Sequence, residues 1–320
     1  MNPARAQGIR MGDVTRASAG CSASSAKIER MSTKTRLGAA AAGIAAAVVL
    51  SACSTGVAGQ PVAVQSSATT ISTTAAQQPL RWVDVEAEAP QLDHDSVGAR
   101  FGSAVYPGIG LTQVGPDKST VDCSAGPAVT GGVVVAAHCD AAPGGRVQIY
   151  PNAKGSSPIP VGVITDRVLQ QVDPVRDFAL LRSTTVASGS TVIAGRWAIA
   201  GVLTEEAAPS ALPVGSPVCV NAAYTGIRCG AVLSTDDDGE LLFNVRTEIG
   251  DSGAAVFAVN ADTGAATLIG IVRGGDEMTS TATYLAPALD KLGVSALVDP
   301  TASANTVADS RYSRMTTPAP

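Results

Sequence analysis

The 320-residue chain has few charged and few aromatic side chains. Charged residues make up 15% of it and aromatic residues 3%, and the net charge is −5. Because nucleic-acid binding needs Lys and Arg gathered into a basic patch, this composition excludes a nucleic acid as partner. The cysteines show no C-x-x-C spacing and there are only two histidines. The sequence therefore contains no metal-ligand cluster, and we expect no metal and no cofactor.

Small and β-branched residues are abundant instead. Hydrophobic residues make up 45%, with 33 glycines and 19 prolines, a composition that favours short strands and many turns. Between about residues 96 and 300, Gly, Pro, Asp and Asn separate short apolar runs such as GGVVVAAH, DFALLR, PVCVNA and ATLIGIV. These runs predict an all-β domain, either a sandwich or a pair of small barrels. One late helical pattern, from Tyr284 to Val294 with a stop at Gly293, predicts a short C-terminal helix.

The segment that begins at Met31 has the pattern of an export signal. Lys34 and Arg36 form a basic start, and Leu37–Leu50 is uncharged and apolar. This stretch is shorter than the ~20 apolar residues of a membrane-spanning helix, which favours a signal peptide over residues 31–52. A buried Ala-rich helix is the alternative. The sequence Leu-Ser-Ala-Cys that ends at Cys53 resembles the bacterial lipoprotein box, which implies a lipid on Cys53 that anchors the protein to the membrane.

The other terminal segments are polar and lack periodicity. We interpret residues 1–30 as a mis-called extension ahead of a true start at Met31. Residues 53–95, with the run QSSATTISTTAAQQP, predict a disordered tether, and residues 301–320 a disordered tail. The folded domain is then 96–300, in a protein exported to the outer face of the bacterial cell membrane or secreted.

Three residues in the predicted domain can supply catalytic chemistry together. His138 ends an apolar strand, Asp177 opens DFALLR, and Ser252 lies in the turn I-G-D-S-G. Each alone is more often a structural residue, and His94, in the polar run LDHDS, is interpreted as solvated. Together they supply a nucleophilic hydroxyl, an imidazole base and a carboxylate that orients the base.

The turn around Ser252 can also supply an oxyanion hole. Stabilisation of the tetrahedral intermediate needs main-chain N–H groups directed at the developing negative charge. A Ser turn flanked by glycines offers those of Gly250 and Ser252, and glycine permits close approach of the backbone to a ligand.

In this order, AAHC, DFALL and GDSG resemble the chymotrypsin superfamily of serine proteases, specifically its bacterial, streptogrisin-like branch. Four cysteines fall into two couples, Cys123/Cys139 and Cys219/Cys229, which are typical disulfides in an exported chain; the resemblance implies the same two pairings. It further implies two six-stranded antiparallel β-barrels, with the site between them, and no cofactor. Arg273, Gly274 and Gly275 match the edge segment that pairs with the substrate backbone.

The sequence departs from this branch at two charged positions. Arg273 replaces a small residue, and we expect it either to pair with Glu248 or Asp251 or to favour an acidic substrate side chain. Asp251 lacks the basic partner that relatives supply, since Val220 occupies that position, and the candidates are Arg228, Arg246 and Arg273.

The segment between Thr247 and the GDSG turn is short, so the specificity pocket must be remodelled. The predicted function is a serine endopeptidase acting on peptides or proteins through an acyl-enzyme. The alternatives are an esterase with the same triad and a catalytically retired protease fold that serves as a surface binding module.

Overall fold

The structure is a computed structural model that describes residues 79–90, 100–303, 306 and 308–319. Cys53, His94 and the proposed signal peptide lie outside these residues. In the described part of the chain, no helix is long and apolar enough to cross a membrane.

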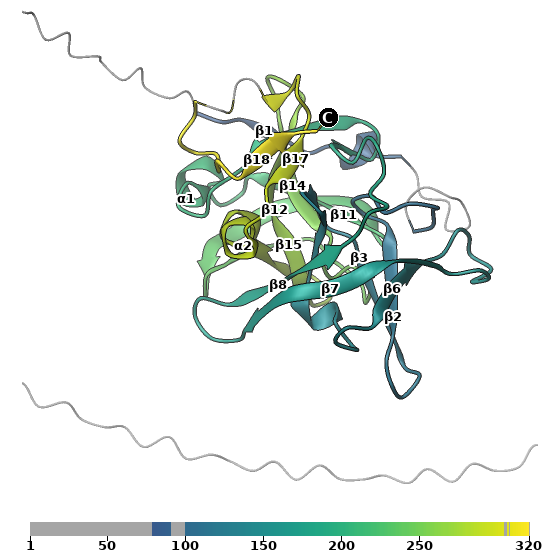
Figure 1. The fold of residues 1–320 in the computed structure, drawn as a ribbon. Coiled ribbons are helices and arrows are strands. Elements are labelled where there is room, and N and C mark those ends of the chain that lie inside the picture. Colours follow the sequence, from purple (N-terminus) through teal and green to yellow (C-terminus); the bar gives the residue numbers. More distant parts are fainter. Residues whose placement is uncertain (1–78, 91–99, 304–305, 307, 320) are drawn as a thin grey trace, which may run out of the picture. The chain divides into compact units, whose positions relative to one another are not determined.

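Seven strands of the N-terminal half of the domain form a β-barrel, in which β3 and β4 are two parts of one run of chain (Figure 1). In the sheet order, β4 neighbours β5, followed by β8, β7, β6, β2 and β3. Only residues 125–127 separate β3 from β4, so these two ends of the sheet are one run of chain and the ring closes through the backbone. The strands are β2 (Gly110–Val114), β3 (Thr120–Ser124), β4 (Ala128–Val129), β5 (Gly132–Val135), β6 (Arg146–Ile149), β7 (Ile159–Gln170) and β8 (Arg176–Arg182).

The C-terminal half forms a second barrel, of six strands. The ring runs β14-β11-β12-β13-β16-β15 and closes by pairing of β15 with β14. All of its pairings are antiparallel. Its strands are β11 (Pro217–Ala222), β12 (Gly226–Asp237), β13 (Glu240–Phe243), β14 (Ala255–Asn260), β15 (Ala266–Gly275) and β16 (Ser280–Tyr284). The all-β prediction is thereby confirmed, as two barrels.

Short elements flank the two rings. Strand β9 (Val192–Ile193) pairs with β10 (Trp197–Val202), and β10 runs parallel to β15 outside the second ring. A four-residue helix α1 (Ala208–Ala211) follows. Helix α2 (Leu285–Leu292) ends at Gly293, which adopts the left-handed conformation with φ 65° and so permits the helix to stop. The predicted C-terminal helix is confirmed.

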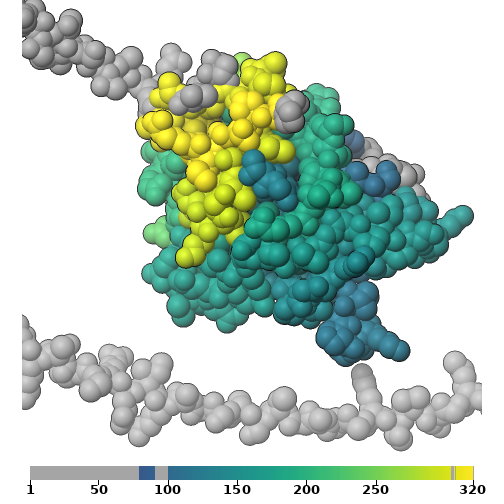
Figure 2. Space-filling model, in the orientation of Figure 1, coloured from purple at the N-terminus to yellow at the C-terminus, as the bar shows by residue number. Residues whose placement is uncertain are grey.

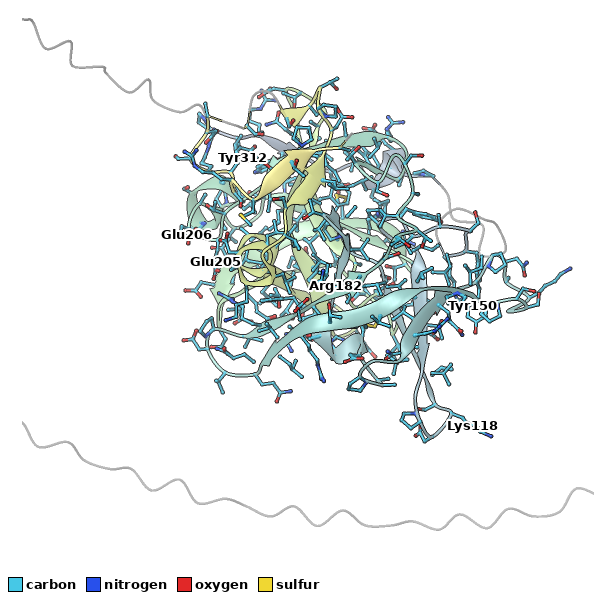
Figure 3. The ribbon with its side chains drawn as sticks, in the orientation of Figure 1. Lys118, Tyr150, Arg182, Glu205, Glu206 and Tyr312 are labelled. Carbon is cyan, nitrogen blue, oxygen red and sulfur yellow. A yellow bond between two sulfur atoms is a disulfide. The ribbon has the colours of Figure 1, made fainter. Side chains whose placement is uncertain are left out.

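The turns between strands follow from short polar side chains. At the tip of the β2–β3 hairpin, the carboxylate of Asp117 accepts the main-chain N–H of Ser119 at 3.0 Å; Lys118 projects there into solvent (Figure 3). Between β14 and β15, Asn260 accepts the N–H groups of Asp262 and Thr263 at 2.9 and 3.1 Å. Such side-chain bonds replace main-chain pairing where the chain reverses.

Order extends beyond both predicted domain boundaries. Within the expected tether, β1 (Trp82–Val83) pairs with β14, and the 3-10 helix η1 (Glu86–Glu88) follows it. The Trp82 indole N–H donates to the carbonyl of Ala211 at 2.6 Å. Residues 79–90 are therefore part of the fold, because β1 pairs with the end of β14 beyond the residues of β14 that pair with β11.

The expectation of a disordered C-terminal tail is wrong for its described residues. Strand β17 (Ala296–Val298) pairs with β4 and, in parallel, with β18 (Thr316–Pro318). Tyr312 forms a bridge with Leu203. Polar composition conceals this segment in the sequence, because main-chain pairing orders it and few of its side chains, Met315 among them, pack against the core. The C-terminal residues, in yellow, lie against the body of the domain (Figure 2).

Candidate functional site

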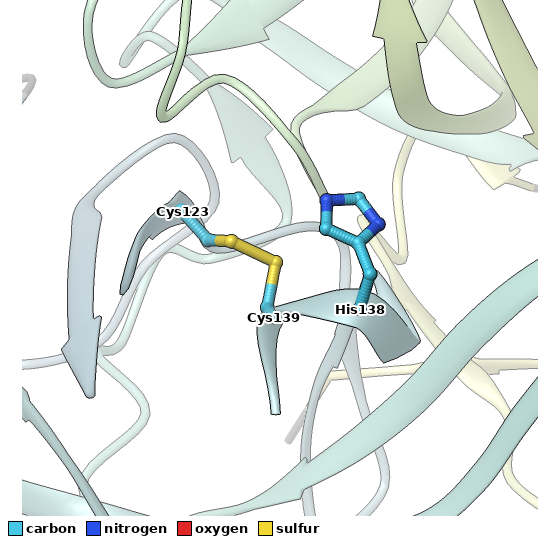
Figure 4. A group of neighbouring side chains, drawn as sticks. All are labelled: Cys123, His138 and Cys139. Carbon is cyan, nitrogen blue, oxygen red and sulfur yellow. A yellow bond between two sulfur atoms is a disulfide. The ribbon is translucent and has the colours of Figure 1, made fainter. Parts of the chain in front are cut away.

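A fully buried strand positions His138. Strand β5 leads into the 3-10 turn η2 (Ala137–Cys139), in which Ala137 and Cys139 are buried. The His138 side chain between them is 37% exposed. A disulfide joins Cys139 to Cys123 and ties this turn to β3; Figure 4 shows the imidazole projecting beside it. The histidine is therefore held on a rigid turn with one side open.

Asp177 lies beside this turn because β5 and β8 are antiparallel, with Val135 opposite Ala179. Its side chain is 3% exposed. The carboxylate contacts His138 twice: Oδ2 lies 2.5 Å from Nδ1, and Oδ1 accepts the main-chain N–H at 3.1 Å. Since a carboxylate only accepts, Nδ1 carries the proton of the neutral ring and Nε2 presents a lone pair.

Ser252 lies in a turn of the second barrel that is bonded to the first. Its carbonyl accepts the N–H of Ser124 at 2.8 Å, and the Ser124 hydroxyl donates to the carbonyl of Gly250 at 2.9 Å. A Cβ on Gly253 would lie 2.6 Å from the Ser124 oxygen and 3.1 Å from the Ala136 nitrogen. Only glycine allows this approach, which brings the Ser252 backbone against the turn that carries His138.

The Ser252 hydroxyl contacts the main-chain carbonyl of Arg273 at 3.5 Å. In the described part of the chain it forms no hydrogen bond with His138. The N–H groups of Gly250 and Ser252 donate to no acceptor among the described residues. Gly250 has φ 102°, a conformation that glycine adopts readily. The turn thus offers two unused main-chain donors next to a hydroxyl.

The environment of Asp251 differs from the expectation. None of Arg228, Arg246 and Arg273 binds this fully buried carboxylate. Its partners are Glu248 N–H at 2.8 Å, the Thr225 hydroxyl at 2.9 Å, and the N–H groups of Tyr224 at 3.1 Å and Thr225 at 3.3 Å. Burial raises the pKa of Asp251, and these hydrogen bonds partly offset the shift. No residue type marks these main-chain donors in the sequence.

Arg273 also has a partner that the sequence did not indicate. Its Nε donates to both carboxylate oxygens of Glu240, at 2.7 and 2.8 Å. It pairs with neither Glu248 nor Asp251, so the expected salt bridge exists with a different carboxylate. Glu240 lies at the start of β13, and the sheet order β13-β16-β15 places it across β16 from Arg273 on β15.

Among the residues that the structure describes, the strand segment that ends at Gly275 has no strand partner on one side. Gly274 and Gly275 pair with Thr281 and Ser280 of β16, whereas pairing with β14 extends only to Ile271. A cavity of about 450 Å³ adjoins it, and its lining includes Ser252, Val272, Thr247, Glu248, Ile249, Gly274, Gly275 and Asp276. The fold therefore provides a strand edge and a hollow directly beside Ser252.

In the described part of the chain, one group of residues of the types that bind metals lies close together: Cys123, His138 and Cys139. Both sulfurs are joined in the disulfide, and Nδ1 of His138 is engaged with Asp177. The group therefore lacks the free thiolates of a metal site. The second predicted disulfide, Cys219–Cys229, is also present.

No protein-family model and no curated protein match this chain. Among solved structures it is similar to Cellulomonas bogoriensis chymotrypsin, with 22% identity, coverage of 63% of this chain and 100% of that one, and a TM-score of 0.42. It is also similar to Thermobifida fusca protease A, with 23% identity, coverage of 62% and 100%, and a TM-score of 0.43. For Nocardiopsis protease, the identity is 23%, the coverage 60% and 98%, and the TM-score 0.41.

Proposed function

We propose that this protein is a serine endopeptidase in which His138, Asp177 and Ser252 form the catalytic triad. The observation that carries the proposal is the short contact between His138 Nδ1 and Asp177 Oδ2. It leaves Nε2 as a base on a turn packed against the backbone of Ser252. The two unused N–H groups of Gly250 and Ser252 are suited to an oxyanion.

In the proposed reaction, the Ser252 hydroxyl turns from the Arg273 carbonyl toward His138. Nε2 takes its proton as Oγ bonds to the substrate carbonyl carbon, and the negative oxygen accepts the N–H groups of Gly250 and Ser252. His138 then protonates the leaving amine as the C–N bond breaks. A water molecule then gives a proton to His138 and attacks the acyl carbon, and His138 returns the proton to Ser252 as the ester bond breaks. Asp177 stabilises the imidazolium without taking its proton.

The substrate binds as an added strand in this proposal. An extended peptide would pair with the free side of Arg273, Gly274 and Gly275, since main-chain bonds to a strand edge hold peptides of varied sequence. Gly274 has no heavy atom within 4 Å of an added Cβ, so the face of the strand at this position is open. The adjoining cavity would receive the side chain next to the scissile bond.

We also propose that the protein is exported and lipid-anchored through Cys53. Two disulfides occur in the described residues, and disulfides persist in oxidising compartments outside the cytoplasm. The signal-peptide pattern and the Cys at its end agree with that location.

A fluorophosphonate probe tests the proposed function. We expect it to label the purified protein at Ser252 and to fail on Ser252→Ala and His138→Ala. Ser210→Ala, a change at an exposed serine on α1, is the matched control and should label normally. Equal labelling of Ser252→Ala would contradict the triad. Absence of labelling in the native chain would favour the retired binding module, and turnover of esters without peptides would favour the esterase.

A further inference from the structure

An ion pair lies directly beside the proposed triad. The Glu240 side chain is 2% exposed and the Arg273 side chain is 39% exposed. Besides the two bonds from Arg273 Nε, this carboxylate accepts the hydroxyl of Thr283 at 3.4 Å. Because a buried charge is costly without a partner, Glu240 depends on Arg273 and in turn holds the guanidinium in one place.

Arg273 is connected to the nucleophile and to the acid of the triad. Its carbonyl contacts the Ser252 hydroxyl at 3.5 Å. Hydrogen bonding to Glu240 is the main influence that raises the pKa of Arg273, with smaller contributions from the charges of Glu240, Asp177 and Asp237. The guanidinium therefore stays charged at working pH, within electrostatic range of Asp177.

The β12–β13 turn fixes this geometry from the other barrel. Its Asp238 carbonyl accepts the N–H of Val175 at 2.8 Å, and its Gly239 carbonyl accepts Nη1 of Arg176 at 2.7 Å. Val175 and Arg176 directly precede Asp177, and Gly239 directly precedes Glu240. The chain segments that carry Asp177 and Glu240 are thus hydrogen-bonded to each other across the two barrels.

Building on the proposed function, we infer that Arg273 is a positioning residue whose charge acts on the Asp177–His138 pair, and that Glu240 limits that action. A free guanidinium would compete with His138 for the Asp177 carboxylate and would disfavour the imidazolium that forms during catalysis. Held by both oxygens of Glu240, the cation leaves Asp177 to the histidine.

Few other charges face this pair in the described part of the chain. Asp237 lies at the end of β12 and acts on Arg273. Nη2 of Arg176 is held by both oxygens of Glu205, at 3.0 and 2.9 Å. On the histidine's own turn, Asp140 accepts from Gln113 at 3.3 Å. Arg273 and Glu240 are therefore the charges to remove.

Substitutions that remove one charge at a time should have opposite effects. In Glu240→Gln the uncompensated cation should shift the acid limb of the pH–activity profile to lower pH, by about half a unit or more. In Arg273→Gln the uncompensated anion should shift the limb to higher pH. The double variant Arg273→Gln/Glu240→Gln should return toward the native profile. We expect kcat to change more than KM.

Shifts in the same directions should appear in a measurement that does not depend on catalysis. The chain has only two histidines, so in a His94→Gln background the NMR titration of the imidazole reports His138 alone. This readout separates the two proposals, since it holds even if the native chain fails to react with the fluorophosphonate. Glu88→Gln, which breaks an exposed ion pair with Arg196, is the matched control and should shift nothing.

The melting temperature of each full-length variant shows whether it is folded under the conditions of the titrations, so that unfolding is excluded as the cause of a shift. A merely structural pair would lower stability without moving either titration. If Arg273→Gln does not fold, Glu240→Gln and the double variant still decide. Shifts in the same direction, or no shift in either readout, would overturn the inference.

Discussion

Buried carboxylates at three positions receive different partners in this domain, and the partners decide what each can do. Asp177 contacts an imidazole, Glu240 a guanidinium, and Asp251 only main-chain N–H groups and one hydroxyl. The first arrangement leaves a base free on His138. The last one ties the turn that carries Ser252 to the Tyr224–Thr225 loop without needing a cation.

Asp251→Asn should therefore distort that turn. The asparagine side chain has one oxygen and one NH2 group in place of the two carboxylate oxygens. The NH2 group would face the N–H of Glu248 or the N–H groups of Tyr224 and Thr225, and it cannot accept a hydrogen bond from them. We expect fluorophosphonate labelling to slow by about 10²-fold, the scale of losing one oxyanion donor. Labelling kinetics measure this, with Asp262→Asn, at an exposed turn, as control; unchanged kinetics would contradict the role given to Asp251.

The pH dependence of stability at Asp251 follows from its raised pKa. Below the ordinary aspartate pKa of 3.8, the group is protonated in the folded and unfolded chain. As the pH rises above this value, Asp251 ionises first in the unfolded chain. Its contribution to the free energy of unfolding therefore falls until the pH has passed the raised pKa of the folded protein. Asp251→Asn should lessen that loss in denaturant titrations across acid pH.

At the scale of elements, the two disulfides have separate tasks. Cys123–Cys139 ties the His138 turn to β3, whereas Cys219–Cys229 joins directly opposed residues of β11 and β12. Both close short loops, with separations of 16 and 10 residues. On the chain-entropy account each stabilises the fold by about 3 kcal/mol.

Removing the two disulfides one at a time should show that both affect stability and that one of them also affects reactivity. Cys219→Ala/Cys229→Ala should lower the free energy of unfolding by about 3 kcal/mol and leave labelling of the folded protein unchanged. Cys123→Ala/Cys139→Ala should cause a similar loss of stability and also slow labelling, because the His138 turn loses its tie. Denaturant unfolding and labelling rates, measured under folding conditions, check both; equal labelling of the two variants would contradict the assignment.

At the scale of the whole molecule, the described part begins at residue 79 and the proposed lipid site is Cys53. Acyl chains add about 0.8 kcal/mol of membrane affinity per buried methylene, so two or more hold a protein firmly. Cys53→Ser should move the protein from the membrane fraction to the medium or soluble fraction, with labelling at Ser252 retained. Ser210→Ala, at the exposed serine on α1, is the control and should stay in the membrane fraction; retention of Cys53→Ser in the membrane would contradict the anchor.

Local sequence determined the pieces of this protein whose physics is local. Alternating and apolar runs gave the strands, glycine and short polar residues gave the turns, glycine gave the end of α2, and a short list of reactive residues gave His138, Asp177 and Ser252 as candidates. The tertiary structure alone decided which groups meet: Glu240 with Arg273, the Tyr224–Thr225 backbone with Asp251, β1 with β14, and β18 with β17. Partners far apart in the chain are chosen by strand register and barrel closure, and main-chain donors have no residue type by which a sequence could announce them.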